Sequence, residues 1–390
     1  MSWQDNRKLT IVFVCDDYDN MKTGGVITVS RFTEVLRSMG HTIRIIAPGT
    51  PKEGKYVVPS YNPHNCIMQL AYNQGVTLAK PDKAVIREAL TGADVVYLLM
   101  PSPLSYAAIK MAREMNIAVT AGFHVLAENA TYTIHMGWCK PLSWIIYYMA
   151  KWLVYDKVNY IHCPTQMVED LLKSYHYKGN FYVFSNGTIP FFHPIKVERL
   201  PQLKDKFVVI SVGRYNNEKR QDLVIKAVAK CKYNKDMVLI LAGQGPNAKR
   251  YKKLAKALYN PVIMQFCTQE ELRDYLNMSD LYVHAADAEI ESMSCTEAFS
   301  CGLVPVISNA KRSATQQFAL TERNIFKAGS VDSLVEQLEY WFEHREEKEQ
   351  MSKQYLELSK KYSIQFCAER MVQMFRDALN DPKERKQSQE

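Results

Sequence analysis

Two glutamates mark the part of this sequence that is best suited to binding hydroxyl groups. The run Glu289-Ile-Glu-Ser-Met-Ser-Cys-Thr-Glu297 reads as a loop leading into a short helix that Gly302 ends, since glycine commonly follows the last helical residue. We expect Glu289 on the loop and Glu297 early on the helix, with both carboxylates facing one cleft. A carboxylate has only acceptor atoms and suits the paired hydroxyls of a ribose or a sugar. The alternative is a pair of loop and helix-start acids without a ligand.

A second segment carries positive charge. The run Ser211-Val-Gly213-Arg214-Tyr-Asn-Asn-Glu-Lys219-Arg220 follows an apolar stretch and opens a helix near Asp222. Arg214 and Lys219 could hold a diphosphate, arginine through its planar fork and lysine as a point charge. Solvated surface cations are the alternative interpretation.

Two glycine turns also follow apolar stretches. Gly24 and Gly25 lead into a helix expected from about Ile27 to Met39, where backbone N–H groups can approach an anion at the helix N-terminus. Gly243, in Gly243-Gln-Gly245, could lie beside the same ligand, although a plain turn explains it equally well. The first turn lacks the full G-x-G-x-x-G spacing, which disfavours a dinucleotide-dependent oxidoreductase.

Short apolar runs alternate with longer helical patterns in both halves of the chain. The runs are residues 10–15, 43–47, 95–99, 117–120 and 160–163, then 207–211, 238–242, 262–266, 281–284 and 304–308. Such runs are typical of parallel strands buried on both faces and joined by helices. We therefore expect an α/β protein with two doubly wound units, separated by a Pro-containing segment at 190–206. Ligands of such sheets lie beyond the carboxyl ends of the strands.

Composition limits the classes of function. A chain of 390 residues, 47% apolar and 23% charged, is expected to form two globular domains. No apolar stretch reaches the roughly 20 residues of a spanning helix, and no signal-peptide pattern opens the chain, so we expect a cytoplasmic protein. The nine cysteines lack metal-type spacing and are interpreted as reduced thiols. A net charge of +8 suits a phosphate substrate, an anionic membrane or nucleic acid.

The motifs taken together resemble the large retaining glycosyltransferase family numbered four. The resemblance covers nearly the whole chain and rests on the following residues in this order: Gly24-Gly25, Ser185-Asn186-Gly187 followed by Phe192 and Pro194, Gly213-Arg214 with Glu218-Lys219, then Glu289 with Glu297-Ala298 and Cys301-Gly302. It implies the GT-B fold, with two Rossmann-like domains facing a cleft. The first, acceptor-side domain is expected at 1–195 and the nucleotide-sugar domain at 205–364. A helix at about 365–380 is expected to pack back on the first domain, before a disordered tail at 381–390.

The resemblance also implies roles for individual residues. A nucleotide diphosphate sugar is the donor, and neither a metal nor another cofactor is essential. Arg214 and Lys219 neutralise the diphosphate, Glu297 binds the ribose and Glu289 contacts the transferred sugar. The donor-binding set implied is Gly24, Gly25, Asn186, Gly213, Arg214, Lys219, Gly243, Glu289 and Glu297. The leaving phosphate oxygen can accept the acceptor's proton, which is the front-face route proposed for retaining members, so no dedicated general base is required.

His124 stands in Ala121-Gly-Phe-His124-Val, where many members of the family place a histidine against the donor sugar. A structural histidine is the alternative. The chain departs from the family after the first glutamate, where small residues, often glycine, are replaced by Glu291, Ser292 and Met293. This departure leaves the identity of the donor hexose open between glucose and galactose, with a uridine donor expected.

The acceptor is suggested by an aromatic segment between Trp138 and Tyr160. Its side chains Trp138, Trp144, Tyr148, Lys151 and Trp152 could lie in a membrane interface, with the rings at headgroup depth and lysines on anionic lipid. A buried domain helix is the alternative. The sequence after His124 also resembles glycolipid-forming members of the family, which favours a lipid hydroxyl on diacylglycerol or ceramide.

Three functions follow from these patterns. The first is a transferase that makes an alpha-glycolipid, peripheral on the cytoplasmic face of the inner membrane, with no nucleic acid as partner. The second is a soluble transferase that extends a capsular or other glycan, and the two differ in whether activity requires lipid vesicles. The third is a protein of another class that binds a nucleotide sugar without transferring it.

Overall fold

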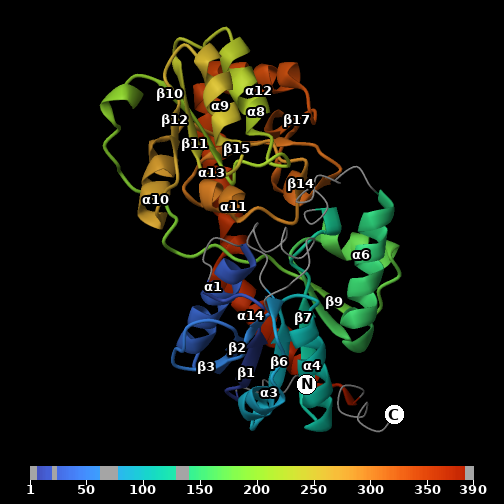
Figure 1. The fold of residues 1–390 in the computed structure, drawn as a ribbon. Helices are drawn as coiled ribbons and strands as arrows, with labels where there is room; N and C mark the ends of the chain where they lie inside the picture. The colour runs from blue at the N-terminus through green and yellow to red at the C-terminus, as the bar shows by residue number, and fades with distance from the viewer. Residues whose placement is uncertain (1–6, 20–23, 62–77, 129–139, 383–390) are drawn as a thin grey trace. The chain divides into compact units, whose positions relative to one another are not determined.

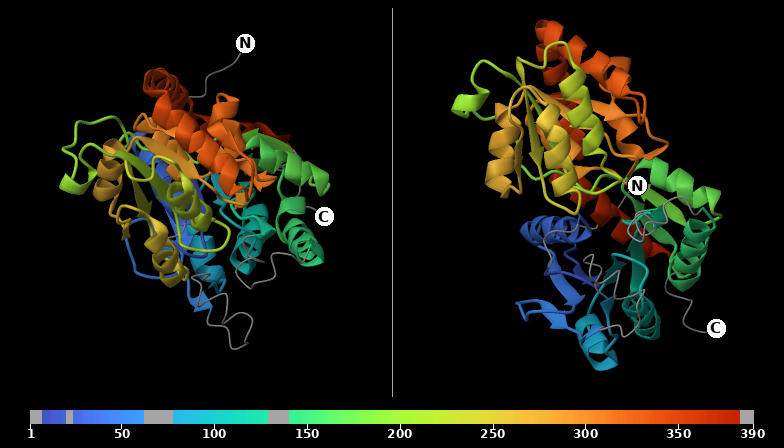
Figure 2. Two further views of the ribbon diagram at one scale, coloured as in Figure 1. Left: turned by 90° about the horizontal axis from the view of Figure 1, so that it is seen from above. Right: turned by 45° about the horizontal axis from the view of Figure 1, so that its top comes forward.

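The structure is a computed structural model that describes residues 7–19, 24–61, 78–128 and 140–382 (Figure 1). The chain divides into two compact units. The first unit comprises residues 1–187 together with 364–390, and the second comprises residues 188–363. Each unit contains one large parallel sheet with helices packed on it (Figure 2).

The first unit has a seven-stranded sheet in the order β3-β2-β1-β6-β7-β8-β9, and all neighbouring strands are parallel. The strands are β1 (Thr10–Val14), β2 (Thr42–Ala47), β3 (Lys55–Val57), β6 (Val95–Leu98), β7 (Ala118–Gly122), β8 (Tyr160–Cys163) and β9 (Asn180–Val183), with a separate antiparallel pair β4 (Ser60–Tyr61) and β5 (Leu78–Ala79). The helices are α1 (Gly24–Ser38), α3 (Lys83–Leu90), α4 (Pro103–Glu114), α6 (Lys140–Leu153), α7 (Gln166–Ser174) and α14 (Ile364–Asn380).

The second unit repeats this architecture with a six-stranded parallel sheet in the order β12-β11-β10-β13-β15-β17. The strands are β10 (Phe207–Val212), β11 (Met237–Ala242), β12 (Ile263–Gln265), β13 (Leu281–His284), β15 (Val304–Ser308) and β17 (Ile325–Phe326), with a small pair β14 (Ala288–Glu289) and β16 (Arg312–Ser313). The helices are α8 (Gln221–Lys230), α9 (Ala248–Leu254), α10 (Gln269–Met278), α11 (Met293–Ser300), α12 (Val331–Glu343) and α13 (Arg345–Ser359).

Short 3-10 helices connect several of these elements. They span Tyr155–Lys157, Pro201–Leu203, Ala255–Ala257, Ala314–Phe318, Glu322–Asn324 and Lys360–Tyr362. The segment from 188 to 206 belongs to the second unit, and Phe192 and Leu203 are part of that unit's core.

The strands form where the sequence has continuous apolar runs. Every residue of β6, β7, β8 and β11 is buried, because helices cover both faces of a parallel sheet. Local signals start the helices as well. Asp82 caps α3 by accepting N–H bonds from Ala84 (2.9 Å) and Val85 (3.2 Å), and Pro103 occupies the first position of α4.

The last helix, α14, belongs to the first unit although it closes the chain. It packs against α1, β7 and β8, and its red ribbon runs among the blue and teal elements of that unit (Figure 1). One apolar stripe of α14, including Met371 and Phe375, is fully buried.

In both sheets the order in which successive strands are added reverses at one pair of central strands. In the first unit the order reverses between β1 and β6, and in the second unit it reverses between β10 and β13. The second sheet therefore has the 3-2-1-4-5-6 strand order of a Rossmann fold, in which ligands bind beyond the carboxyl ends of the strands at the reversal point.

Candidate active site

The loops that follow β10 and β13 are joined at the reversal point of the second sheet. The backbone N–H of Asp287 donates to the carbonyl oxygen of Glu218 at 2.8 Å. Beside it, Arg220 Nη1 lies 3.0 Å from Asp287 Oδ2 and Lys219 Nζ contacts Glu289 Oε2. Three consecutive residues of one loop thus contact the other loop, and this brings together the charged segments that the sequence singled out.

The contact between Lys219 and Glu289 fixes the charge of the glutamate. Burial alone would raise the pKa of Glu289, but the positive charge of Lys219, with a smaller contribution from the nearby His284, lowers it to about 2. The carboxylate is therefore ionised at any physiological pH. A partly buried carboxylate of this kind accepts hydrogen bonds from hydroxyl groups.

His284 is a site residue that we did not single out from the sequence. It is the last residue of β13, and its Nε2 lies 3.5 Å from Glu289 Oε2. Burial lowers the pKa of His284, so the ring is neutral. On its other side, His284 Nδ1 lies 3.2 Å from the hydroxyl of Tyr282 and 3.4 Å from that of Ser292. Its place at the carboxyl end of a central strand is the signal that could have identified it.

Ser292 occupies the position where the family commonly has a small residue. Its φ of +74° lies in the left-handed region that glycine adopts without steric cost. Its hydroxyl contacts Ser294 at 3.2 Å as well as His284, which ties the strained residue to the histidine beside Glu289. In this loop a serine therefore adopts a backbone conformation that glycine adopts more easily.

Gly213 and Gly243 let two loops approach each other. A Cβ on Gly243 would lie 2.0 Å from the carbonyl oxygen of Gly213, and both glycines have φ values near +155°, at +151° and +159°. Gly245 is equally restricted, since a Cβ there would lie 2.7 Å from the backbone of Tyr215. Packing between the loops is a sufficient reason for Gly243 and Gly245, whereas a Cβ on Gly213 would make only ordinary contacts, at 3.6 Å or more, and its φ of +151° is what favours glycine there.

Arg214 and Glu297 come from different elements of the second unit. Arg214 follows β10 after Gly213 and is exposed, while its carbonyl oxygen accepts a hydrogen bond from Gln221 at 3.0 Å. Glu297 is buried, with 5% exposure, on α11. Because α11 begins at Met293, Glu297 lies in the middle of this eight-residue helix and not early on it, which corrects the sequence-based expectation. Gly302 follows the helix with a φ of +85°, as expected.

The first unit holds the remaining donor-binding residues that the resemblance implies. Gly24 and Gly25 form the first turn of α1, which begins three residues earlier than expected, at Gly24 in place of Ile27. A Cβ on Gly25 would make only ordinary contact, at 3.6 Å from Leu99, so packing does not demand a glycine here. Asn186 is buried just beyond β9, in a turn where the N–H of Gly187 donates to Ser185 Oγ at 3.0 Å.

His124 follows β7 at the carboxyl edge of the first sheet. Its Nε2 lies 2.7 Å from the hydroxyl of Tyr97, a buried residue of β6. Burial lowers the pKa of His124 to about 4, so the ring is neutral above that pH. His124 is thus held by a specific partner while remaining partly exposed.

Most of the aromatic segment forms α6. Trp138 lies outside the described residues. Trp144 and Trp152 are 53% and 68% exposed. They lie eight positions apart on one helical face, with the partly buried Tyr148 four positions from each. Ile145 and Met149 extend this exposed apolar face. Lys151 Nζ lies 2.9 Å from Asp156 Oδ1 and is thereby paired. In the described part of the chain, no helix is both long and apolar enough to cross a membrane.

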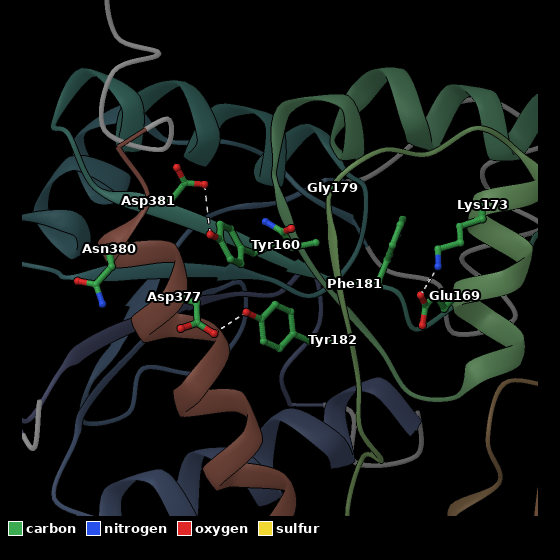
Figure 3. A pocket seen from close by; sticks show the side chains of 10 residues that line it. Tyr160, Glu169, Lys173, Gly179, Phe181, Tyr182, Asp377, Asn380 and Asp381 are labelled. Atoms are coloured by element: carbon green, nitrogen blue, oxygen red, sulfur yellow. Dashed lines mark hydrogen bonds and ion pairs between the residues drawn. The ribbon is translucent and has the colours of Figure 1, made fainter. Parts of the chain in front are cut away.

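A pocket of about 710 Å³ lies elsewhere in the first unit (Figure 3). It is lined at the amino ends of β8 and β9 and by the end of α14. Its carboxylates are engaged by neighbours: Tyr182 donates to Asp377, Tyr160 donates to Asp381 at 3.2 Å, and Lys173 pairs with Glu169. The pocket opens at the opposite strand ends from His124, so we do not assign it to the active site.

Two family models match consecutive parts of the chain. The model described as "Glycosyltransferase Family 4" matches residues 23–190, and "Glycosyl transferases group 1" matches residues 194–357. Alpha-monoglucosyldiacylglycerol synthase of Streptococcus pneumoniae is 26% identical over 230 residues, which are 55% of this chain and 52% of the synthase. The chain therefore spans about half the length of this curated relative.

Two solved structures are also similar. The catalytic domain of cholesterol-alpha-glucosyltransferase from Helicobacter pylori is 43% identical, with 40% of this chain and 99% of that domain covered and a TM-score of 0.39. The structure of Anabaena Alr3699/HepE in complex with UDP and glucose has a TM-score of 0.70 at 13% identity, and the match covers 95% of this chain and 100% of that one.

The two Rossmann-like units define the GT-B class of glycosyltransferase folds, as the motifs predicted. The chain belongs to glycosyltransferase family 4, because the two models together account for both units, and the resemblance drawn from its motifs is confirmed.

Proposed function

We propose that this protein transfers a hexose, glucose or galactose, from a uridine diphosphate donor to a hydroxyl of diacylglycerol or ceramide. The transfer retains the anomeric configuration of the sugar and needs no metal ion. The observation that carries the proposal is the pairing of Lys219 with Glu289 where the second sheet reverses its order. The Lys219 cation and the Glu289 carboxylate, which accepts hydrogen bonds from hydroxyl groups, are thereby held side by side at the ligand-binding edge of the sheet.

This arrangement suits the reacting part of a nucleotide sugar. The diphosphate gains negative charge as the bond to the sugar breaks, so Lys219 and Arg214 stabilise the transition state more than the ground state. Glu289 accepts hydrogen bonds from sugar hydroxyls and Glu297 from those of the ribose. The complex of Alr3699/HepE with UDP and glucose, a protein of the same fold, supports the choice of uridine donor.

The exposed face of α6 supports a lipid acceptor. Trp144, Ile145, Met149 and Trp152 present a contiguous apolar stripe, and such stripes on surface helices mark contact sites. Tryptophan rings with an apolar body and a polar edge settle at the headgroup level of a bilayer. The similarity to the alpha-monoglucosyldiacylglycerol synthase of Streptococcus pneumoniae supports the same class of acceptor.

A panel of donors and acceptors tests the proposal. UDP-glucose, UDP-galactose and GDP-mannose are offered with vesicles that contain diacylglycerol, ceramide or a sterol, with and without a chelator. We expect an alpha-linked lipid product from a uridine donor, at a rate that the chelator leaves nearly unchanged. Mass spectrometry identifies the product and NMR its anomeric configuration. Transfer only to soluble glycans would overturn the lipid acceptor, and donor binding without turnover would overturn the enzyme itself.

A further inference from the structure

Three polar rings meet at the carboxyl edge of the first sheet. The hydroxyl of Tyr97 lies 2.7 Å from His124 Nε2 and 2.9 Å from His162 Nδ1. Tyr97 lies on β6 and His162 on β8, the two strands that flank β7, and His124 lies in the loop after β7. Tyr97 and His162 are buried, with 1% and 0% exposure, and neither belongs to the motifs of the family resemblance.

The hydrogen-bond partners determine where the protons lie. His162 Nε2 is 2.8 Å from the carbonyl oxygen of Phe184, which can only accept, so Nε2 carries the proton. Burial lowers the pKa of His162 well below its usual value, so the ring is neutral and its Nδ1 is an acceptor. The single proton of the Tyr97 hydroxyl is therefore donated to His162. The Tyr97 oxygen is left to accept a hydrogen bond from the N–H of His124 Nε2.

Gly122 makes this arrangement possible. A Cβ at this position would lie 2.0 Å from the Tyr97 hydroxyl oxygen and 2.3 Å from His124 Nε2, in the space that their hydrogen bond occupies. Tyr155 donates to the carbonyl oxygen of Gly122 at 2.9 Å and holds the backbone from the other side. The His162 ring is in turn stacked on Phe184, with ring centroids 3.8 Å apart. Each member of the chain of bonds is fixed by its own packing.

We propose that Tyr97 and His162 hold His124 in the tautomer that is protonated on Nε2, so that Nδ1 is presented to a hydroxyl of the donor sugar as a hydrogen-bond acceptor. The identity of that ligand rests on the proposed function, whereas the tautomer does not. Tyr97 and His162 are positioning residues: they act through His124, which alone would touch the sugar. A histidine that exchanged its two tautomers would offer a donor and an acceptor in turn and would recognise the hydroxyl less well.

NMR of the unliganded protein with ¹⁵N-labelled histidine tests the tautomer directly. We expect the His124 signals to show an unprotonated Nδ1 and a proton on Nε2 at neutral pH. After Tyr97→Phe, which removes the acceptor of that proton, we expect a mixture of both tautomers. A wild-type His124 that is already mixed, or that carries its proton on Nδ1, would overturn the inference regardless of any activity.

Kinetics of the same variant connect the tautomer with the sugar. Tyr97→Phe should lower kcat/KM for the donor about tenfold, the effect of one hydrogen bond, while UDP itself binds as before. Tyr177→Phe is the matched control: it removes another buried hydroxyl bond of the first unit, to the carbonyl oxygen of Tyr147 at 2.6 Å, and it should leave both the tautomer and kcat/KM near wild type. Equal losses in both variants would reduce Tyr97 to a packing role. A fixed tautomer in a protein that transfers no sugar would overturn the proposed function alone.

Discussion

At the scale of single residues, the charge of Glu289 is balanced by a lysine of the same unit. Lys219, which the family resemblance assigns to the diphosphate, contacts Glu289 directly. A lysine shared between the glutamate and the donor's phosphates would couple recognition of the sugar to recognition of the leaving group. The two motif segments then act as one binding unit.

Glu289→Gln separates these two roles. Transfer should fall about a hundredfold, the typical loss when one group that stabilises the transition state is removed. UDP should bind as tightly as before or more tightly, because Lys219 loses the carboxylate that competes with phosphate. Steady-state kinetics and calorimetric titration with UDP measure the two effects. A loss of UDP affinity as large as the loss of kcat would contradict a sugar contact for Glu289.

Arg214→Ala and Glu297→Ala test the nucleotide site. Each should weaken donor binding roughly ten- to hundredfold, since each removes charge-assisted hydrogen bonds. Lys235→Ala is a suitable control, because Lys235 is an exposed cation at the opposite, amino end of β11. Titration with the donor gives the affinities. Wild-type binding and transfer in both variants would rule out the assigned site.

The low pKa of His124 predicts a pH dependence of stability. The folded protein protonates His124 at about pH 4 and the unfolded chain at about 6.5, so the unfolded state binds more protons between these values. The stability that neutral His124 contributes is present above pH 6.5 and is lost as the pH falls toward 4. As the pH falls from 6.5 to 4, the free energy of unfolding of wild type should therefore decrease relative to that of His124→Gln, as urea titrations can measure. Parallel curves for the two proteins would contradict the prediction.

Residue types and spacing identified candidates but could not reveal how they pair. Glu289, Lys219 and His124 stand after strand-like runs, which is why the sequence singles them out. Tyr97 and His162 lie inside such runs, where tyrosine and histidine look like ordinary strand residues, and their hydrogen bonds depend on register between strands. His284 is different, because it ends its run at the carboxyl edge of the sheet, and its position alone could have identified it.

At the scale of elements, ten strands of the two large sheets were predictable from their apolar runs, whereas β3, β9 and the strands of two residues were not. The ten apolar runs correspond to β1, β2, β6, β7, β8, β10, β11, β12, β13 and β15. The paired strands β14 and β16 have two residues each, so they contain no periodicity to recognise. They form because Ala288 and Glu289 find partners at Arg312 and Ser313, a tertiary contact that the local sequence does not encode.

The α6 helix provides a prediction at this scale. Replacing Trp144 and Trp152 with serine should weaken binding to anionic vesicles more than tenfold, since each ring contributes roughly 2 kcal/mol when buried in an interface. Donor binding should not change. The control is Tyr259→Ser with Phe266→Ser, which removes two exposed aromatics of the second unit. Vesicle sedimentation compares the two, and equal binding by wild type and a folded tryptophan variant would exclude an interfacial role for α6.

At the scale of the whole molecule, the chain's last helix stabilises the unit in which the chain began. Phe375 of α14 is fully buried and packs edge-on against Tyr97 at 6.1 Å between ring centroids. Phe375→Ala should reduce the stability of the first unit by about 3–5 kcal/mol, whereas Phe366→Ala, at an exposed position of the same helix, should have little effect. Calorimetry should show a lower melting temperature for the first unit only. Equal shifts from the two substitutions would contradict this packing role.

The second unit is also an insertion, because the chain leaves the first unit after Gly187 and re-enters it at Ile364. The two crossing points are neighbours: the N–H of Thr188 donates to the carbonyl oxygen of Tyr362 at 2.7 Å, and a Cβ on Gly187 would strike Ile364. Entry and exit are thus a single junction made of a few residues. A chimera that keeps this junction could exchange residues 188–363 for the corresponding segment of another family member, which would separate the part of donor recognition that the second unit carries from the part that our proposal assigns to His124 of the first unit.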